Sequence, residues 1–280
     1  MKTIIGNWKM NGSFEEVDDW ISRFMQGYSQ NYDQLVGHEI ALCPPNIMLD
    51  YIDGEIINDS FKRLDEDILQ KGQRIDDLSA DEINDSLIQK RMLKLGAQDC
   101  HHEDSGAYTG DVSAKMLKEV GCDYVILGHC ERRHHHNESD ATIAKKIKAA
   151  IENQIIPVIC LGESKAVREK NDHLRFLKEQ LLKTVPADVK FPKMVIAYEP
   201  IWSIGTGIIP KAKEIAEVAS LIKSACQENF PESADNLAIL YGGSVSTKNA
   251  ANILSIPDIS GLLVGKASLN PEDFIQICLS

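Results

Sequence analysis

The chain has 280 residues, of which 43% are hydrophobic, and carries a formal net charge of -12 at pH 7. This length suits one large α/β domain or two small ones, and the acidic balance argues against binding to nucleic acid or an anionic membrane, since both need basic surface. Apolar runs reach only strand length, so no membrane-spanning segment is expected, and the polar residues soon after Met1 predict no signal peptide.

Short β-rich runs alternate with amphipathic stretches along the whole chain. Most runs are continuously apolar, which is typical of strands in a parallel sheet that is covered on both faces. The amphipathic stretches between them, such as 141–153 and 212–228, predict crossover helices. The predicted strands are Thr3–Trp8, Glu39–Cys43, Leu93–Gln98, Tyr124–Gly128, Ile156–Leu161, Met194–Tyr198, Leu237–Tyr241 and Gly261–Val264.

Eight strands, each followed by a helix, close most simply into a single (β/α)₈ barrel of the α/β class. The alternative is an open, doubly wound sheet. It is disfavoured because the sequence lacks the GxGxxG dinucleotide fingerprint and because polar residues gather at the ends of many different strands. We therefore expect one domain over residues 1–280.

The connection between the second and third predicted strands is unusually long. It runs from Asn46 to Met92, far beyond a short loop and one helix. Within it, residues 53–91 hold 11 acidic and 6 basic side chains, a net charge of -5, and apolar residues recur at helical spacing. We expect an acidic helical insertion on the outside of the barrel. A solvated elaboration is the simpler interpretation, and a regulatory or partner-binding role is the alternative.

Polar residues follow several predicted strands, where the active sites of barrels lie. Lys9 follows the first strand, His129 the fourth and Glu199 the sixth, and glycine-rich loops follow the last two. Each is commonplace alone, since a lone lysine is usually solvated and a lone histidine is usually structural. Together, a cation, an imidazole, a carboxylate and two glycine-rich loops at one barrel mouth predict proton transfer on a small phosphorylated molecule.

The cysteines and histidines give no sign of a metal centre. The seven cysteines are scattered without a CxxC pair, which favours reduced thiols and a cytoplasmic location. The histidine runs 101–102 and 134–136 lack a recognised ligand spacing. We expect neither a metal nor a cofactor.

Several short segments carry residues typical of one enzyme family. In chain order they are 6–11 (GNWKMN), 96–98 (GAQ), 105–110 (SGAYTG), 128–133 (GHCERR), 197–200 (AYEP), 205–207 (GTG), 241–244 (YGGS) and 263–269 (LVGKASL). In composition and order they resemble the triosephosphate isomerase family, with only the insertion unmatched. The resemblance implies an aldose–ketose isomerase of glycolysis and gluconeogenesis. Its substrates would be dihydroxyacetone phosphate and D-glyceraldehyde 3-phosphate, interconverted through an enediolate.

The resemblance also implies a role for each catalytic residue. Glu199 would be the general base and His129 the neutral electrophile that polarises the carbonyl, which is the established pairing of that family. Lys9 would supply a fixed positive charge near the developing oxyanion and the phosphate. Asn7 would orient Lys9 and donate to substrate oxygens. Glu131 would be the family's further acidic residue near the lysine.

Phosphate binding, the lid and the dimer are implied in the same way. Backbone N–H groups would hold the phosphate, because successive amides form an anion-binding concavity. Residues 200–207 would form a lid that excludes water. Ser105–Gly110 matches a loop that packs into the partner subunit, so a homodimer is implied. The implied phosphate-binding residues are Gly205, Ser244, Gly265 and Lys266.

Three positions depart from the family pattern: Asp99 replaces an asparagine, Cys130 a serine, and Lys266 the second glycine of the last phosphate loop. Asp99 would either pair with Lys9 and compete with substrate, be protonated, or turn away. Lys266 would be strained if its position required positive φ, and would otherwise add its ammonium to phosphate binding. Two other functions remain open: another barrel enzyme acting on a phosphorylated sugar, or an inactive binding protein that uses the insertion.

Overall fold

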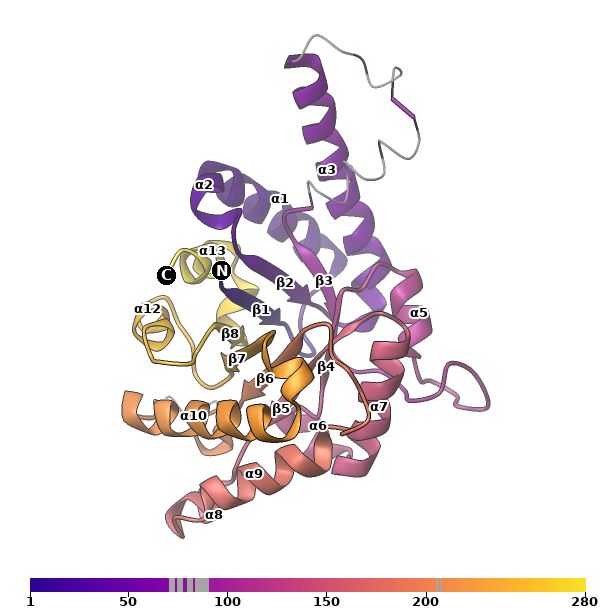
Figure 1. The fold of residues 1–280 in the computed structure, drawn as a ribbon. Coiled ribbons are helices and arrows are strands. Elements are labelled where there is room, and N and C mark those ends of the chain that lie inside the picture. The colour runs from indigo at the N-terminus through magenta and orange to yellow at the C-terminus, as the bar shows by residue number, and fades with distance from the viewer. Residues whose placement is uncertain (71–73, 75–77, 80–82, 84–90, 205, 207) are drawn as a thin grey trace.

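Eight parallel strands form a closed barrel in the order β1 to β8, surrounded by helices (Figure 1). The computed structural model describes residues 1–70, 74, 78, 79, 83, 91–204, 206 and 208–280. β1 pairs in parallel with both β2 and β8, so the sheet has no free edge. The predicted (β/α)₈ barrel is confirmed, and the open doubly wound sheet is excluded.

All eight predicted strands are present, with small differences at their ends. The prediction ran one residue too far at Trp8, at both ends of the third strand and at Gly128, where the chain already turns out of the sheet. The strands are β1 (Thr3–Asn7), β2 (Glu39–Cys43), β3 (Lys94–Ala97), β4 (Tyr124–Leu127), β5 (Ile156–Leu161), β6 (Met194–Tyr198), β7 (Leu237–Tyr241) and β8 (Gly261–Val264).

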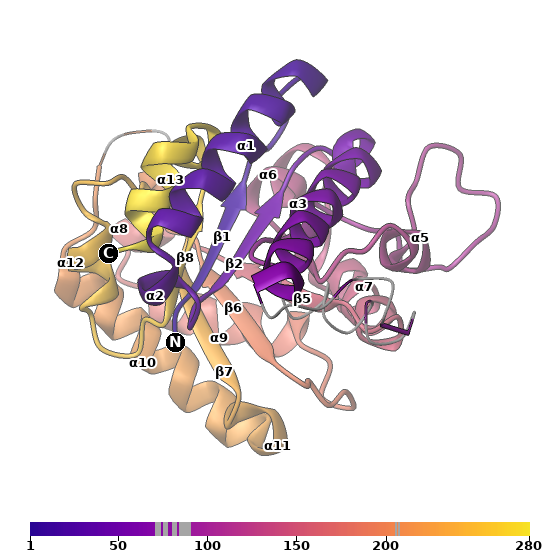
Figure 2. The same ribbon diagram turned by 90° about the horizontal axis from the view of Figure 1, so that it is seen from above.

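The helices cover the outside of the barrel, as Figure 2 shows from above. The longer ones are α1 (Phe14–Gln30), α3 (Leu49–Gln70), α7 (Asp140–Glu152), α9 (His173–Thr184), α10 (Ala212–Asn229) and α13 (Pro271–Cys278). The shorter ones are α2 (Tyr32–Leu35), α5 (Ala114–Glu119), α6 (Cys130–His135), α8 (Lys165–Glu169), α11 (Pro231–Ala234), α12 (Ala250–Leu254) and the 3₁₀ turns η1 (Asn46–Met48), η3 (Ile201–Ser203) and η4 (Lys266–Leu269). In the described part of the chain, no helix is both long and apolar enough to span a bilayer.

The continuously apolar strands are explained by two separate cores. In β6, Val195 and Ala197 belong to the cluster that fills the barrel interior. The alternate residues Ile196 and Tyr198 belong to the larger cluster between the strands and the helices. Because successive side chains of a strand point to opposite faces, both sets must be apolar. The rigid barrel that results holds the strand ends, and hence the site, in fixed positions.

The barrel closes where the first and last strands meet. Thr3 to Gly6 lie in register with Gly261 to Val264. A Cβ atom at Gly261 would lie 1.9 Å from the carbonyl oxygen of Thr3, so a larger residue would push the two strands apart. The indoles of Trp8 and Trp20 both donate to the carbonyl oxygen of Ser268, at 3.1 and 3.0 Å. These bonds tie the loop after β1 and helix α1 to the loop after β8.

The insertion begins as a long helix that extends away from the barrel (Figure 1). Helix α3 carries buried Ile52 and Ile56 at its base, packed in the outer core. Asp53 near its start forms an ion pair with Arg91, so the two ends of the insertion are held together. Helical structure is confirmed up to Gln70, while the helical spacing of apolar residues further along the insertion falls largely outside the described residues.

Candidate active site

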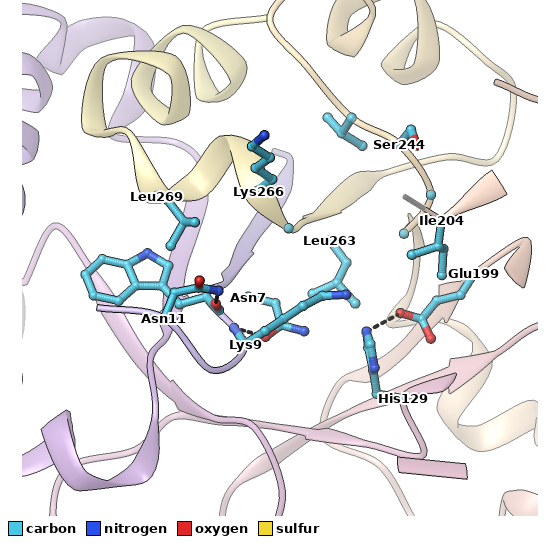
Figure 3. Close-up of a pocket in the computed structure, with 15 residues that line it drawn as sticks. Asn7, Lys9, Asn11, His129, Glu199, Ile204, Ser244, Leu263, Lys266 and Leu269 are labelled. Atoms are coloured by element: carbon cyan, nitrogen blue, oxygen red, sulfur yellow. Dashed lines mark hydrogen bonds and ion pairs between the residues drawn. The ribbon is translucent and has the colours of Figure 1, made fainter. Parts of the chain in front are cut away.

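A pocket of about 500 Å³ opens at the carboxyl ends of the strands (Figure 3). Its lining brings together residues that follow five different strands. Glu131 lines an adjoining pocket that shares Lys9, and Gly205 lies outside the described residues. The predicted site residues that line the main pocket are Asn7, Lys9, His129, Glu199, Ser244, Gly265 and Lys266.

His129 is held by the helix that follows β4. It is the N-cap residue of α6, and its Nδ1 atom accepts a hydrogen bond from the backbone N–H of Glu131 at 3.2 Å. An acceptor at Nδ1 carries no proton, so the proton of the ring is on Nε2. Nε2 lies 3.0 Å from Oε1 of Glu199 (Figure 3). The imidazole therefore presents a donor to the pocket, directly beside a carboxylate.

Burial and charge act in opposite directions on His129. Burial lowers its pKa, whereas the Glu199 carboxylate and the Cys130 thiol raise it; the raising influence dominates, so the pKa of His129 lies above its usual value. A raised pKa alone would favour a second proton on the ring, but the N–H of Glu131 that points at Nδ1 opposes protonation there, so the geometry favours the neutral ring with its proton on Nε2. A ligand that separated the two side chains would weaken the influence of Glu199, while the amide at the start of α6 would still oppose a proton on Nδ1. The ring would then face that ligand as a neutral donor.

The Glu199 carboxylate is fixed by the backbone around it. Its side chain is 2% exposed, and Oε2 accepts a hydrogen bond from the backbone N–H of Cys130 at 3.1 Å. Its own N–H donates to the carbonyl oxygen of Leu161 at 2.7 Å. A Cβ atom at Gly162 would lie 1.9 Å from the Glu199 carbonyl oxygen, so only glycine fits there without moving the base.

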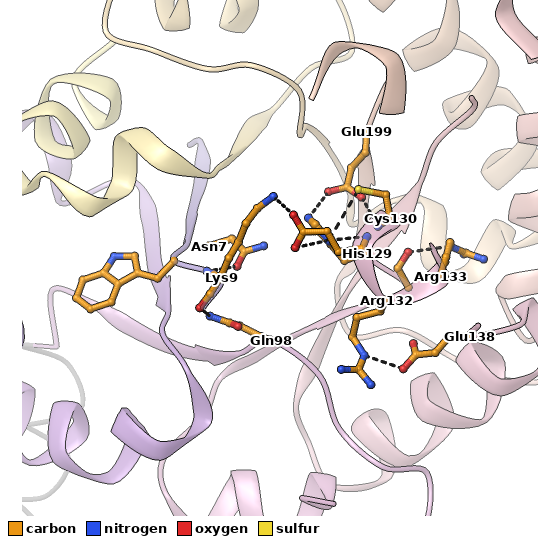
Figure 4. A network of polar contacts seen from close by, with 12 residues as sticks. Asn7, Lys9, Gln98, His129, Cys130, Arg132, Arg133, Glu138 and Glu199 are labelled. Carbon is orange, nitrogen blue, oxygen red and sulfur yellow. Dashed lines mark hydrogen bonds and ion pairs between the residues drawn. The ribbon is translucent and has the colours of Figure 1, made fainter. Parts of the chain in front are cut away.

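Lys9 adopts a left-handed backbone conformation, with φ of 54°. This conformation is costly for a residue with a long side chain and is held by two neighbours. Asn7 Oδ1 accepts the N–H of Lys9 at 3.0 Å, and Gln98 Nε2 donates to the Lys9 carbonyl at 2.8 Å. The Lys9 ammonium forms an ion pair with Glu131 (Figure 4).

Glu131 is ionised in this arrangement. Burial would raise the pKa of its carboxyl group, but the hydrogen bond from Lys9 and the nearby His129 outweigh burial and lower the pKa. The ion pair directs the Lys9 side chain across the mouth of the barrel, between helix α6, which holds Glu131, and the main pocket. Glu131 therefore acts on the pocket through Lys9.

The loops after β7 and β8 form the other wall of the pocket. Ser244 Oγ donates to the carbonyl oxygen of Ser203 at 2.9 Å, which links the β7 loop to the predicted lid. Lys266 is exposed and does not adopt a left-handed conformation. Of the two alternatives expected from the sequence, backbone strain at Lys266 is therefore excluded. The other, an added ammonium group near the phosphate, remains.

The predicted lid begins with the 3₁₀ turn η3 and is anchored by a carboxylate that the sequence analysis missed. Glu163 is fully buried, accepting from Trp202 Nε1 at 2.8 Å and from the Tyr198 hydroxyl at 3.1 Å. A signal for it existed, because Glu163 lies two residues after β5 and is thus another polar residue at a strand end. Gly205 and Gly207 lie outside the described residues.

Asp99 is turned away from Lys9. Both of its carboxylate oxygens accept from Lys146 Nζ at 2.8 Å, and Arg132 Nη2 lies 2.9 Å from Oδ2. Glu138 Oε1 binds Arg132 (Figure 4) and also Lys146, each at 2.7 Å. Asp99 therefore belongs to a partly buried network of two cations and two anions, and does not compete with a substrate for Lys9.

Comparisons with known proteins agree with this geometry. The family model described as triosephosphate isomerase matches residues 2–73 and 76–280. A triosephosphate isomerase of Aquifex aeolicus is 37% identical over 100% of this chain and 99% of its own, and one of Bartonella bacilliformis is 38% identical over 98% and 94%. The crystal structure of triosephosphate isomerase from Bartonella henselae matches with a TM-score of 0.77 at 33% identity, covering 99% of this chain and 97% of that one. The chain belongs to the triosephosphate isomerase family.

Proposed function

We propose that this chain interconverts dihydroxyacetone phosphate and D-glyceraldehyde 3-phosphate, with Glu199 as the base that moves the proton. The observation that carries the assignment is the 3.0 Å contact between His129 Nε2 and Glu199 Oε1 at the floor of a pocket of about 500 Å³. A proton donor for the carbonyl oxygen and a base for the adjacent C–H are thereby adjacent, as the isomerisation requires.

In the proposed reaction, Glu199 removes a proton from the carbon next to the carbonyl. The negative charge that develops on the oxygens is stabilised by the Nε2–H of His129 and by the ammonium of Lys9. His129 moves protons between the two oxygens of the enediolate, and Glu199 returns its proton to the neighbouring carbon. One carboxylate both takes and returns the proton, so the reaction needs no cofactor and no metal ion.

The phosphate would lie against the opposite wall. Ser244 and Gly265 would offer backbone N–H groups, joined by Gly205 from the lid, and Lys266 would add its ammonium. The lid over residues 200–207 would close on the bound substrate and exclude water from the enediolate. The hydrogen bond from Ser244 to the Ser203 carbonyl supports a coupling between phosphate binding and the lid.

We also propose that the chain is a cytoplasmic homodimer with one domain over residues 1–280. Residues 105–110 form an exposed loop that extends from the barrel (Figure 1), and Tyr108 is 43% exposed there. A pocket of about 560 Å³ beside the active site is suited to receive this loop from a second copy; its lining includes Lys9, Gln98, Asp99, Glu131 and His135. Light scattering at micromolar concentration tests the assignment: a monomeric mass would contradict it.

The isomerase proposal is tested by a coupled assay of dihydroxyacetone phosphate formation from glyceraldehyde 3-phosphate. Glu199→Gln should be nearly inactive, because an amide cannot accept the proton. Glu169→Gln makes the same chemical change at an exposed position of α8 and serves as the matched control. The proposal is supported if the wild type and Glu169→Gln turn over rapidly and Glu199→Gln has almost no activity. Background rates in all three would identify an inactive relative.

A further inference from the structure

Cys130 lies directly beside the proposed acid–base pair. It is the first residue of α6, immediately after His129, and its Sγ atom lies 3.9 Å from His129 Nδ1. Its backbone N–H donates to Glu199 Oε2 (Figure 4). Six of the seven cysteines are buried, and Cys130 is the partly exposed one. A thiol, an imidazole and a carboxylate therefore converge at one place.

Within the described part of the chain, His129, Cys130 and Glu199 form the one group of three potential metal ligands. One ligand atom from each lies within 4.8 Å of the other two. Ligand atoms that share a tetrahedral zinc ion are about 3.3 to 3.7 Å apart, given bond lengths of about 2.0 to 2.3 Å. Small side-chain rotations would bring the three atoms to that spacing.

We propose that His129, Cys130 and Glu199 form an inhibitory binding site for a thiophilic divalent cation such as Zn²⁺. The donor set is a sulfur, a nitrogen and a carboxylate oxygen, which is the chemistry that zinc prefers over the all-oxygen sites of magnesium or calcium. Three protein ligands leave one position open. That position faces the pocket, where a water molecule or a substrate oxygen completes the coordination.

The charge around the site supports binding of a cation. Glu199 is a carboxylate, and Cys130 becomes a thiolate as its proton passes to solvent when the metal–sulfur bond forms. Two cations near the site are already paired, Lys9 with Glu131 and Arg133 with Asp140. No other lysine or arginine lines the main pocket apart from the exposed Lys266, among the residues described there.

Inhibition follows from the identity of the ligands, and this step rests on the proposed function. The metal would bind the Glu199 carboxylate that takes the substrate proton and the His129 ring that donates to the substrate. The occupied site has neither a free base nor a free donor. Inhibition should be competitive with substrate, because both occupy the same pocket, and chelation should restore the rate.

The first test measures metal binding without reference to activity. Co²⁺, added to the metal-free wild type, should produce a sulfur-to-cobalt charge-transfer absorption with a stoichiometry of one ion per chain. Cys130→Ser should lack this absorption. His134→Ala is the matched control, since it removes a neighbouring exposed imidazole that lines neither pocket, and it should keep the absorption. Absence of the band in the wild type, or its presence in Cys130→Ser, overturns the proposal even if the chain is a fully active isomerase.

The second test measures Zn²⁺ inhibition as the ratio of inhibited to uninhibited rate within each variant. Cys130→Ser should require at least about tenfold more Zn²⁺ for half-inhibition, because loss of a hydrogen-bond partner of a ligand alone costs that much. His134→Ala should be inhibited like the wild type. Equal sensitivity of Cys130→Ser and the wild type would place the inhibitory metal elsewhere. If no variant has isomerase activity, the proposed function fails, while the cobalt spectrum still decides the binding site.

Discussion

Both carboxylate oxygens of Asp99 accept hydrogen bonds from the Nζ atom of Lys146, each at 2.8 Å. The Lys146 side chain is 7% exposed and the Asp99 side chain 17%. A buried ammonium that loses one of its partners keeps its desolvation cost. Removing one partner should therefore destabilise the fold by more than the pair itself contributes to stability.

Asp99→Asn should therefore lower the free energy of unfolding by about 2 kcal/mol, since the amide leaves buried Lys146 and half-buried Arg132 facing only one carboxylate. The Michaelis constant should not change, because Asp99 faces away from Lys9. Asp188→Asn, which disrupts the exposed Lys148–Asp188 pair, is the matched control and should barely change stability. Urea denaturation measures both. An equal effect of the two substitutions would contradict the buried network.

The stabilising effect of Glu138 should depend on pH. Burial would raise the pKa of its carboxyl group, but hydrogen bonds from Lys146 and Arg132 outweigh burial and lower it below its ordinary value of 4.5. A carboxyl whose pKa is lower in the folded state stabilises the fold above its unfolded pKa, and this stability is lost as pH falls through the folded value. The neighbouring Asp99 has a raised pKa, dominated by burial, and so acts in the opposite sense.

Urea denaturation of the wild type and Glu138→Gln between pH 7 and pH 4 tests this expectation. The difference in unfolding free energy should be about 3 kcal/mol at pH 7 and should shrink as pH falls below 4.5. Glu152→Gln, at the exposed end of α7, should show a small difference that is the same at every pH. If the difference in unfolding free energy between the wild type and Glu138→Gln increased as the pH fell, the two cations would not be what keeps the Glu138 carboxyl ionised.

Lys266 should contribute to substrate affinity but not to turnover. Its ammonium is exposed at the phosphate side of the pocket and touches no reacting atom, so Lys266→Ala should raise the Michaelis constant about threefold and leave kcat unchanged. Because salt screens an exposed charge, the effect should fade at 1 M salt. Lys183→Ala, on the exposed face of α9, is the matched control. A large loss of kcat would show that Lys266 positions the loop rather than attracting the phosphate.

Gly162 and Gly54 provide a paired test of how tightly the base is positioned. A Cβ atom at Gly162 would meet the Glu199 carbonyl oxygen at 1.9 Å, whereas one at Gly54 in α3 would meet nothing within 4 Å. Gly162→Ala must displace the backbone of the base, and a displacement of about 1 Å costs about 100-fold in kcat. Gly54→Ala should keep full activity and stabilise α3 by about 0.5 to 1 kcal/mol. Similar kinetics for both variants would show that the contact with Gly162 does not position Glu199 for catalysis.

The strands and the main pocket were predictable because both depend on local patterns. Continuously apolar runs marked all eight strands, and the rule that barrel sites follow the strand ends identified Lys9, His129 and Glu199. The ends of strands were less certain, since Trp8 and Gly128 are compatible with a strand and leave the sheet only because the chain turns toward the site.

The partners of Asp99 could not be predicted from local patterns. Lys146 and Glu138 lie far along the chain and belong to α7 and to the segment before it, so only the packing of α7 against the barrel brings them to Asp99. The backbone conformation of Lys266 was equally inaccessible, because a lysine can adopt positive φ at a cost, as Lys9 does, and only the loop decides whether it must. The positive φ of Lys9 follows from its contacts with Asn7 and Gln98, which no spacing reveals.

The pairing of β1 with β8 has a consequence for the protein during its synthesis. The pocket combines Lys9, which follows the first strand of the barrel, with Gly265 and Lys266, which follow the eighth. A nascent chain that lacks β8 therefore has an open sheet, no second phosphate loop and no acceptor for the indoles of Trp8 and Trp20. Enzymatic competence must wait until β8 has been synthesised and has paired with β1, the first strand made.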